Sequence, residues 1–172
     1  MVQLLLPQSD GSLRPYSLTR ASPYPLTSTG VFPRKVYAAA HVVANPHNLD
    51  PWGKPQVDWD KTLAFRHHLW GLNFKIAEAM DTSQRGMGFD WLNAQELISR
   101  VLAEARTVKG ADLASGAGTD QLAIGEAKTL DDIVRAYEVQ AEFIESHGGR
   151  IILMASRALA TIARTPDDYF KV

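Results

Sequence analysis

Four short apolar runs begin at evenly spaced positions, and this spacing constrains the fold more than any other feature of the sequence. The runs are Val36–Val43, Phe74–Met80, Ala111–Ala117 and Arg150–Ser156. Their first residues, at positions 36, 74, 111 and 150, lie 38, 37 and 39 residues apart. Runs of this length do not need a helix, and largely apolar strands are typical of parallel sheets covered on both faces. We therefore expect four neighbouring parallel β-strands.

Amphipathic segments with helix-start signals separate these runs. Asp58 or Asp60 can cap the first helix, Asp90 begins the second, and Thr129 is the N-cap of the third. Thr165, which is followed by a proline, begins a further helix. The alternation of strand and helix predicts β/α units around a parallel sheet.

A doubly wound sheet and a barrel both satisfy this alternation. After the first run, the sequence from His41 to Pro46 lacks the glycine fingerprint of dinucleotide-binding folds. A complete barrel typically has about 250 residues. The sequence therefore predicts an α/β fold: a (β/α)8 TIM barrel, of which residues 34–172 supply about the first four β/α units.

The first 33 residues are expected to form a separate segment. Val2–Leu6 and Leu13–Leu18 flank a turn that contains Asp10-Gly11, which predicts a β-hairpin. Residues 19–33 are rich in proline, serine and threonine, and we interpret them as a linker.

Composition restricts the possible partners and compartment. The 18 basic and 19 acidic residues nearly balance, so neither a nucleic acid nor a membrane surface is indicated as a partner. The sequence contains no cysteine, which excludes a disulfide framework and fits a reducing compartment. We expect a cytoplasmic protein that binds a small-molecule substrate without a cofactor. Unpaired strand edges in half of a barrel would favour a homo-oligomer.

Five segments of the chain resemble a known family. They resemble a poorly characterised bacterial family that is usually described as dihydrodipicolinate-synthase-like, and the resemblance runs from about Val36 to the last residue. The resemblance implies membership of the class I aldolase superfamily of TIM barrels that includes dihydrodipicolinate synthase and N-acetylneuraminate lyase. The segments are Ala38–Ala44, Thr62–Trp70, Ala77–Gly88, Ala117–Leu122 and Ile151–Leu159.

In that superfamily, a lysine on strand six forms a Schiff base with an α-keto acid, and a tyrosine on strand five relays protons. A Gly-Thr-Thr-Gly-Glu segment after strand two binds the keto-acid carboxylate. Here Thr82 and Ser83 stand where the paired threonines would stand. Asp81 departs from the pattern, because its anion would repel a substrate carboxylate. The resemblance places the lysine and the tyrosine in a second half of the barrel, outside this sequence.

Residues at the C-terminal ends of the strands are the candidate site residues, because barrel enzymes place their chemistry there. Asp81 and His41 are the candidate catalytic groups, and Asp81 can act as a base. Thr82, Ser83 and Arg85 are candidates for substrate binding. Two structural alternatives remain: Asp81 can simply pair with Arg85, and His41 can be a hydrogen-bonded interior residue.

Two further charged residues follow the third and fourth runs. Asp120 ends a glycine-rich segment, and Arg157 can clamp an anionic substrate or lie on the surface at a helix start. Glu78 is expected inside the barrel, where a lysine from the second half or Lys75 would be its partner. Trp52 lies in a loop, where it can cover a ligand, cap the barrel mouth or lie at an interface.

Three functions remain open from the sequence. The favoured one is a Schiff-base aldolase or lyase that acts on a keto acid or an oxidised sugar. The second is a metal-assisted barrel enzyme for a sugar-like substrate, with His41, Asp81 or Asp120 as metal ligands and Glu78 in reserve. The third is a non-catalytic binding module.

Overall fold

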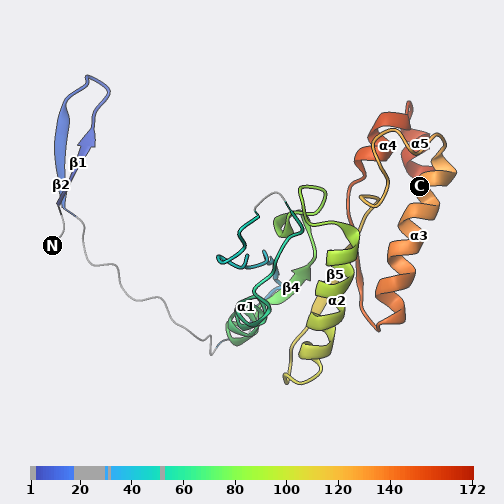
Figure 1. The fold of residues 1–172 in the computed structure, drawn as a ribbon, viewed down its shortest axis with the longest axis horizontal. Helices are drawn as coiled ribbons and strands as arrows, with labels where there is room; N and C mark the ends of the chain where they lie inside the picture. Colours follow the sequence, from blue (N-terminus) through green and yellow to red (C-terminus); the bar gives the residue numbers. More distant parts are fainter. Residues whose placement is uncertain (1–2, 18–29, 31, 51–52) are drawn as a thin grey trace.

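The N-terminal segment forms the predicted hairpin. The structure, a computed structural model, describes residues 3–17, 30, 32–50 and 53–172. Strands β1 (Gln3–Pro7) and β2 (Leu13–Ser17) pair antiparallel and form a sheet of their own, apart from the other strands in Figure 1. Gly11 takes a positive φ of 81° in the connecting turn, which lies at the predicted Asp10-Gly11. The predicted linker, residues 19–33, lies mostly outside the described residues.

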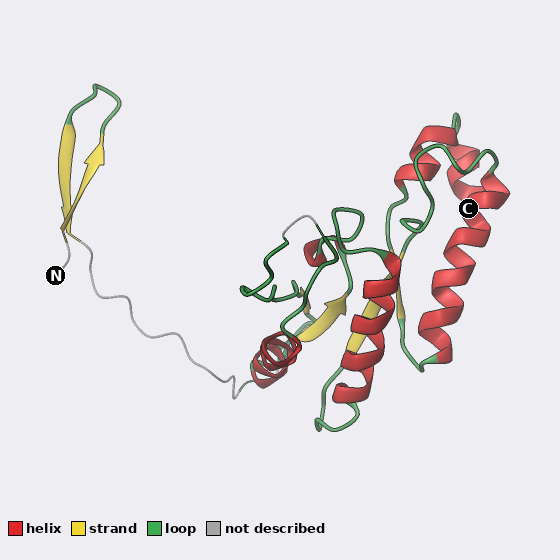
Figure 2. Cartoon of the chain, in the orientation of Figure 1, coloured by secondary structure: helices red, strands yellow, loops and turns green. Residues whose placement is uncertain are grey.

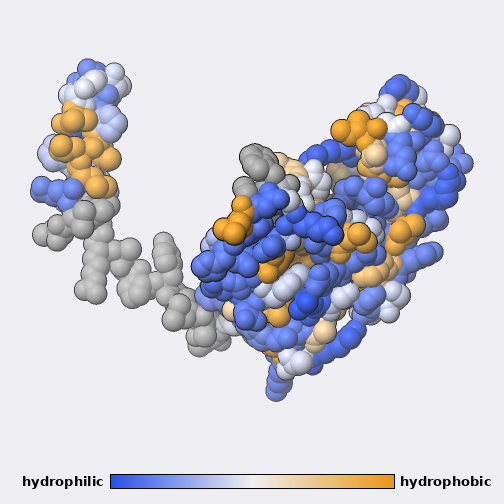
Figure 3. Space-filling view, viewed as in Figure 1, coloured by the Kyte–Doolittle hydropathy of each residue, from blue (hydrophilic) through white to orange (hydrophobic). Residues whose placement is uncertain are grey.

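The hairpin carries large apolar side chains in contact with solvent. Figure 3 shows a cluster of hydrophobic residues along it. Leu5 and Leu13 are 64% and 60% exposed, although such side chains usually lie in a core.

The four apolar runs form the predicted parallel sheet. Its strands are β3 (Tyr37–Ala39), β4 (Lys75–Glu78), β5 (Leu113–Ala117) and β6 (Ile151–Leu153), and they pair in sequence order. All three pairings are parallel, which confirms the expected neighbours. The strands are shorter than the runs. In β4 the cause is local, because Ala79 has a φ of 51°, and this left-handed backbone ends the strand.

Four of the five helices described begin where the capping signals predict, and the short α4, which Ser156 caps, was not predicted from a capping signal. The bounds are α1 (Trp59–Gly71), α2 (Trp91–Ala105), α3 (Leu130–Ser146), α4 (Arg157–Ile162) and α5 (Pro166–Lys171). Asp58, rather than Asp60, caps α1 by accepting the Lys61 N–H at 3.0 Å. Asp90 caps α2, and Thr129 caps α3 in a capping box.

The main core lies between the sheet and the first two of these helices. Ile76 and Leu113 from the strands pack in one buried cluster with Leu97, Ile98 and Val101 of α2. Helix α1 contacts β4, while α3 contacts β5 and β6 (Figure 2). A second, smaller cluster joins α3 to α4 through Ile133 and Leu159. This packing fixes the loops that follow β4, β5 and β6.

The prediction of a (β/α)8 TIM barrel was wrong. Within the described residues, the parallel sheet has four strands, and it is open: β3 pairs only with β4, and β6 pairs only with β5. The molecule is a mixed α/β fold with a two-stranded antiparallel sheet and a four-stranded parallel sheet. Even spacing of apolar runs specifies parallel β/α units, whereas closure depends on strand number, tilt and stagger, which the spacing does not encode.

Candidate functional site

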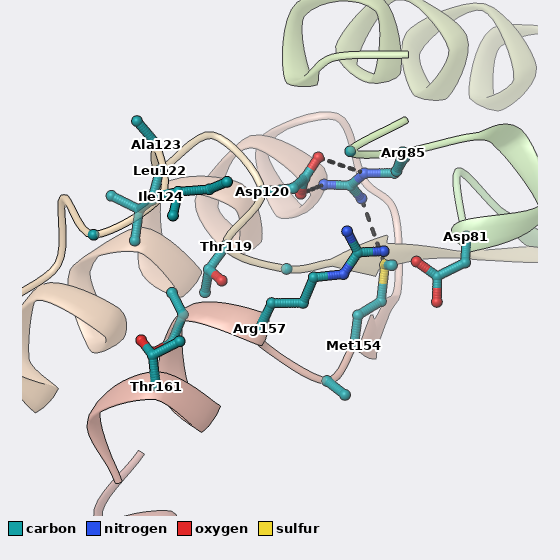
Figure 4. A pocket seen from close by; sticks show the side chains of 15 residues that line it. Asp81, Arg85, Thr119, Asp120, Leu122, Ala123, Ile124, Met154, Arg157 and Thr161 are labelled. Atoms are coloured by element: carbon teal, nitrogen blue, oxygen red, sulfur yellow. Dashed lines mark hydrogen bonds and ion pairs between the residues drawn. The ribbon is translucent and has the colours of Figure 1, made fainter. Parts of the chain in front are cut away.

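A pocket lies at the C-terminal ends of three neighbouring strands. Its volume is about 240 Å³, slightly below the range of roughly 300–1,000 Å³ that is usual for small-molecule sites. Residues after β4, the loop after β5, and residues around the start of α4 form its walls (Figure 4). The lining residues that carry the argument below are Asp81, Arg85, Asp120, Leu122, Ile124 and Arg157.

Arg85 lines one wall of the pocket, and each nitrogen of its guanidinium group makes a hydrogen bond. Its side chain is 1% exposed, and its Nη1 donates to the Ala79 carbonyl at 3.1 Å and to the Gly116 carbonyl at 2.6 Å. Nε donates to Asp120 Oδ2 at 3.2 Å, and Nη2 donates to Asp120 Oδ1. Nη2 also donates to Gln140 Oε1 at 2.6 Å. Because every nitrogen of the guanidinium already binds an acceptor, Arg85 organises the pocket and has no donor to spare for a ligand.

Gln140 on α3 connects this arginine to the loop after β5. Its Oε1 accepts the Gly118 backbone N–H at 2.7 Å, in addition to its bond with Arg85. Its Nε2 donates to Asp120 Oδ1 at 3.1 Å and to Gln121 Oε1 at 2.5 Å. Gln140 is fully buried, so these bonds satisfy an amide that would otherwise be costly to bury. Asp120 is therefore held by both Arg85 and Gln140.

Two opposite charges in the pocket are left without partners. Arg157, at the first position of α4, extends its guanidinium into the pocket in Figure 4. Asp81 begins the 3-10 turn η1 (Asp81–Ser83) and lines the same pocket. In the described part of the chain, neither side chain makes a hydrogen bond or an ion pair, and both residues are exposed. These two groups are therefore the ones available to a ligand.

A hydroxyl pair lies beside the charged groups. Thr119 Oγ1 and Ser156 Oγ are 2.6 Å apart, and Ser156 also caps α4 by accepting the Leu159 N–H at 2.9 Å. The hydroxyl of Tyr137 donates to the Met154 carbonyl. Burial raises the pKa of Tyr137, and a hydrogen bond with Ser156 acts in the opposite direction. Tyr137 thus stays a neutral donor across the physiological range.

The structure brings together only some of the predicted site residues. Asp81, Arg85, Asp120 and Arg157 line the pocket, whereas His41, Thr82 and Ser83 do not. His41 is exposed, and its ring lies 4.9 Å from the ring of Phe65. The Ser83 hydroxyl is turned back to the Met80 carbonyl at 2.7 Å, and Thr82 Oγ1 lies 3.4 Å from the Ala40 carbonyl. The anticipated pairing of Asp81 with Arg85 is absent among the described residues, because Arg85 pairs with Asp120.

The prediction that a lysine pairs with Glu78 was wrong. Glu78 pairs with Arg66 of α1, through Nε to Oε2 at 3.0 Å and Nη2 to Oε1 at 2.8 Å, and both side chains are 0% exposed. Lys75 pairs instead with Asp112. Alternation along β4 places Glu78 on the same face as Ile76, which packs in the core beneath the helices, so its carboxylate meets α1.

Sequence reasoning missed Arg66 and Gln140, although both leave a trace in the pattern. Each is a long polar residue on the buried face of its helix: Arg66 lies between Thr62 and Trp70, and Gln140 lies between Ile133 and Ile144. A polar group at such a position requires a buried partner. That requirement points to a carboxylate or a backbone group on a neighbouring strand.

The described residues contain no cluster of metal ligands that would support the metal-assisted alternative. No group of three or more His, Asp or Glu side chains is gathered there in a way that suits a metal ion. Asp81 and Asp120 share the pocket, but His41 lies outside it.

Trp52, which was expected to cover a ligand, cap the barrel mouth or lie at an interface, falls outside the described residues. Within the described ranges, the chain has no helix of the length and apolarity that a membrane crossing requires.

Comparison with known proteins places the chain in a family. A family model described as "Protein of unknown function (DUF993)" matches residues 4–172. The chain belongs to the DUF993 family. No curated protein matches the sequence. The match covers the hairpin as well as the four-stranded sheet, so this DUF993 protein carries its N-terminal segment as part of the family pattern.

Proposed function

We propose that the pocket of this DUF993 protein binds a small anionic substrate of the keto-acid or oxidised-sugar class. The observation that carries the proposal is the pair of unpartnered opposite charges, Arg157 and Asp81, in one pocket whose other charges are already paired. A guanidinium binds a carboxylate through two parallel N–H groups. A free carboxylate accepts a hydrogen bond from a hydroxyl group, and it can also remove a proton from a ligand.

The proposal gives each charged residue a different role. In the proposal, Arg157 binds the anionic group of the substrate, and Asp81 accepts from a hydroxyl group or acts as the base. Arg85 and Asp120 stay paired and shape the wall between them. This division removes the objection that Asp81 would repel a substrate anion, because Arg157 lies in the same pocket and carries the compensating charge.

Binding of small carboxylates tests the proposal. Pyruvate and gluconate are titrated into the purified protein, and binding is followed by calorimetry and by the shift in melting temperature. Arg157→Gln should weaken the binding of either ligand at least tenfold, because a charge-assisted bidentate contact is lost. Arg135→Gln is the matched control, since Arg135 is an exposed arginine paired with Asp132 outside the pocket. Equal affinities in the wild type and the Arg157 variant would refute the proposal.

The Schiff-base lyase reaction stays a prediction that rests on the family resemblance. None of the described residues that line the pocket is a lysine, so the amine would have to come from outside this lining. Treatment of the full-length protein with borohydride and a keto acid tests it. A covalent adduct on a lysine supports a lyase of this class, and a protein that binds the keto acid without forming an adduct favours a binding module.

We also infer a cytoplasmic location and self-association. The absence of cysteine supports a reducing compartment. The open edges β3 and β6, with Leu153 66% exposed, support contact with another copy. Analytical ultracentrifugation tests the second inference, and a single monomeric species at micromolar concentration would contradict it.

A further inference from the structure

The pocket has two chemically different ends, and the second end is apolar. Beyond Arg157, the wall continues into the loop after β5, where Leu122, Ala123 and Ile124 line the pocket. Ala158, the second residue of α4, also lines the pocket and packs in the same cluster as Leu122. An apolar wall next to a charged group favours a ligand that has both an apolar part and a group of opposite charge.

The loop that supplies this wall is anchored rather than free. Leu122 packs against the small buried cluster between α3 and α4, and its backbone N–H donates to the Thr119 carbonyl at 3.1 Å. Glu126 closes the tip of the loop: its carboxylate accepts the Ala123 N–H at 2.7 Å, and its own N–H donates to the Ala123 carbonyl at 3.1 Å. These bonds hold the apolar side chains at the pocket.

Ile124 stands at the tip of this turn with its side chain completely in solvent. Its relative exposure is 106%, the highest among the large hydrophobic residues that the structure describes as exposed. The next residue, Gly125, has a φ of 74°, which turns the chain back so that Ile124 is presented at the bend. An aliphatic side chain fixed in water beside a ligand pocket gains free energy when a ligand covers it.

We infer that the apolar end binds an aliphatic chain, so that of the two substrate classes proposed above an alkyl 2-oxo acid fits the pocket and a polyhydroxylated sugar acid does not. This inference rests on the proposed function, because Arg157 must hold the anionic group for the chain to reach Leu122 and Ile124. The carboxylate and the chain then occupy opposite ends of one pocket. A sugar acid would place hydroxyl groups against Leu122, Ala123 and Ile124, whose side chains offer no hydrogen bond. The two hydroxyls that also line the pocket are already engaged: Thr119 bonds to Ser156, and Thr161 donates to the Ala158 carbonyl.

A series of 2-oxo acids tests the inference. Pyruvate, 2-oxobutyrate, 2-oxopentanoate and 2-oxohexanoate each add one methylene group, and burying one methylene strengthens binding about fourfold at most. We expect affinity for the wild type to rise about two- to fourfold at each step, with gluconate weaker than 2-oxohexanoate. Calorimetry measures the dissociation constants directly.

Two variants separate the inference from the proposed function. Ile124→Gln should flatten the dependence on chain length, so that the affinities for pyruvate and 2-oxohexanoate lie closer together than in the wild type. The matched control, Leu49→Gln, changes another apolar residue that is 98% exposed and lies outside the pocket, and should keep the full dependence. If the wild type binds the acids with no dependence on chain length, or if Ile124→Gln keeps the dependence, the inference is wrong and the proposed function stands. If none of the acids binds, both the inference and the proposed function are wrong.

Discussion

Removing the charge of Glu78 should destabilise the protein severely without touching the pocket. In Glu78→Gln, the guanidinium of Arg66 stays at 0% exposure but loses its counter-ion. Its bonds to the carbonyls of His41, at 2.6 Å, and Thr62, at 3.2 Å, remain, and these satisfy N–H groups without balancing the charge. Breaking one side of a buried ion pair costs about 3–5 kcal/mol.

That loss is large compared with the total stability of a typical domain, about 5–15 kcal/mol. For a domain of this size, each kcal/mol lowers the melting temperature by about 2–4 °C. We therefore expect the variant to melt about 6–20 °C below the wild type. Circular dichroism during heating measures this shift, and urea denaturation at pH 7 gives the free energy of unfolding.

A surface ion pair is the control. Glu96 and Arg100, on α2, are 47% and 45% exposed, and Glu96→Gln should change stability by less than about 0.5 kcal/mol. The double variant Arg66→Met/Glu78→Met should recover part of the loss, because no charge is left buried. If Glu78→Gln behaves like Glu96→Gln, the pair does not hold α1 on the sheet and the reasoning is wrong.

Three other predictions follow from individual contacts. Gln140→Leu leaves buried donors unpaired, so it should lower the free energy of unfolding by about 2 kcal/mol or more and weaken ligand binding. Urea denaturation measures the loss, and an unchanged free energy of unfolding would show that water replaces the amide. Gly116→Ala would place a Cβ 2.9 Å from the Ala79 carbonyl and against Met154, so its melting temperature should fall; an unchanged melt would show that the strands can separate there. The backbone N–H groups before α3 lower the pKa of Asp132 to about 2. This stabilising effect is complete above the ordinary value of 3.8 and is lost as the pH falls through about 2. The melting temperature of Asp132→Asn should therefore lie below that of the wild type at pH 5 and converge with it near pH 2.

Local features of the fold could be predicted from the sequence. The positions of β4, β5 and β6 follow from apolar runs, and the starts of α2 and α3 follow from Asp90 and Thr129, because strand patterning and capping act over a few residues. Closure of the sheet could not be predicted in this way. A barrel and an open sheet use the same β/α unit and differ only in how the outer strands meet.

The candidate site was predictable as a location and less so as a set of contacts. Strand ends in a parallel sheet lie at one edge, so Asp81, Asp120 and Arg157 could be placed near one another. Their partners could not, because Arg85 and Asp120 are 35 residues apart and pair only once β4 and β5 are in register. The proximity of Asp81 and Arg85 in sequence suggested a pair that the fold does not make among the described residues.

The hydrogen bonds of Arg85 also determine when the pocket can exist during folding. Its acceptors lie on Ala79, Gly116, Asp120 and Gln140, which are far apart in the sequence and belong to segments around β4, β5 and α3. The guanidinium is satisfied only when all of these segments have assembled, so the pocket cannot form in a partly folded chain. Native-state hydrogen exchange should therefore release the Gly118 amide at the same opening free energy as the strands of the sheet. A bound ligand then detects molecules in which β4, β5 and α3 have assembled, and its binding capacity measures the fraction of the protein that has reached this state.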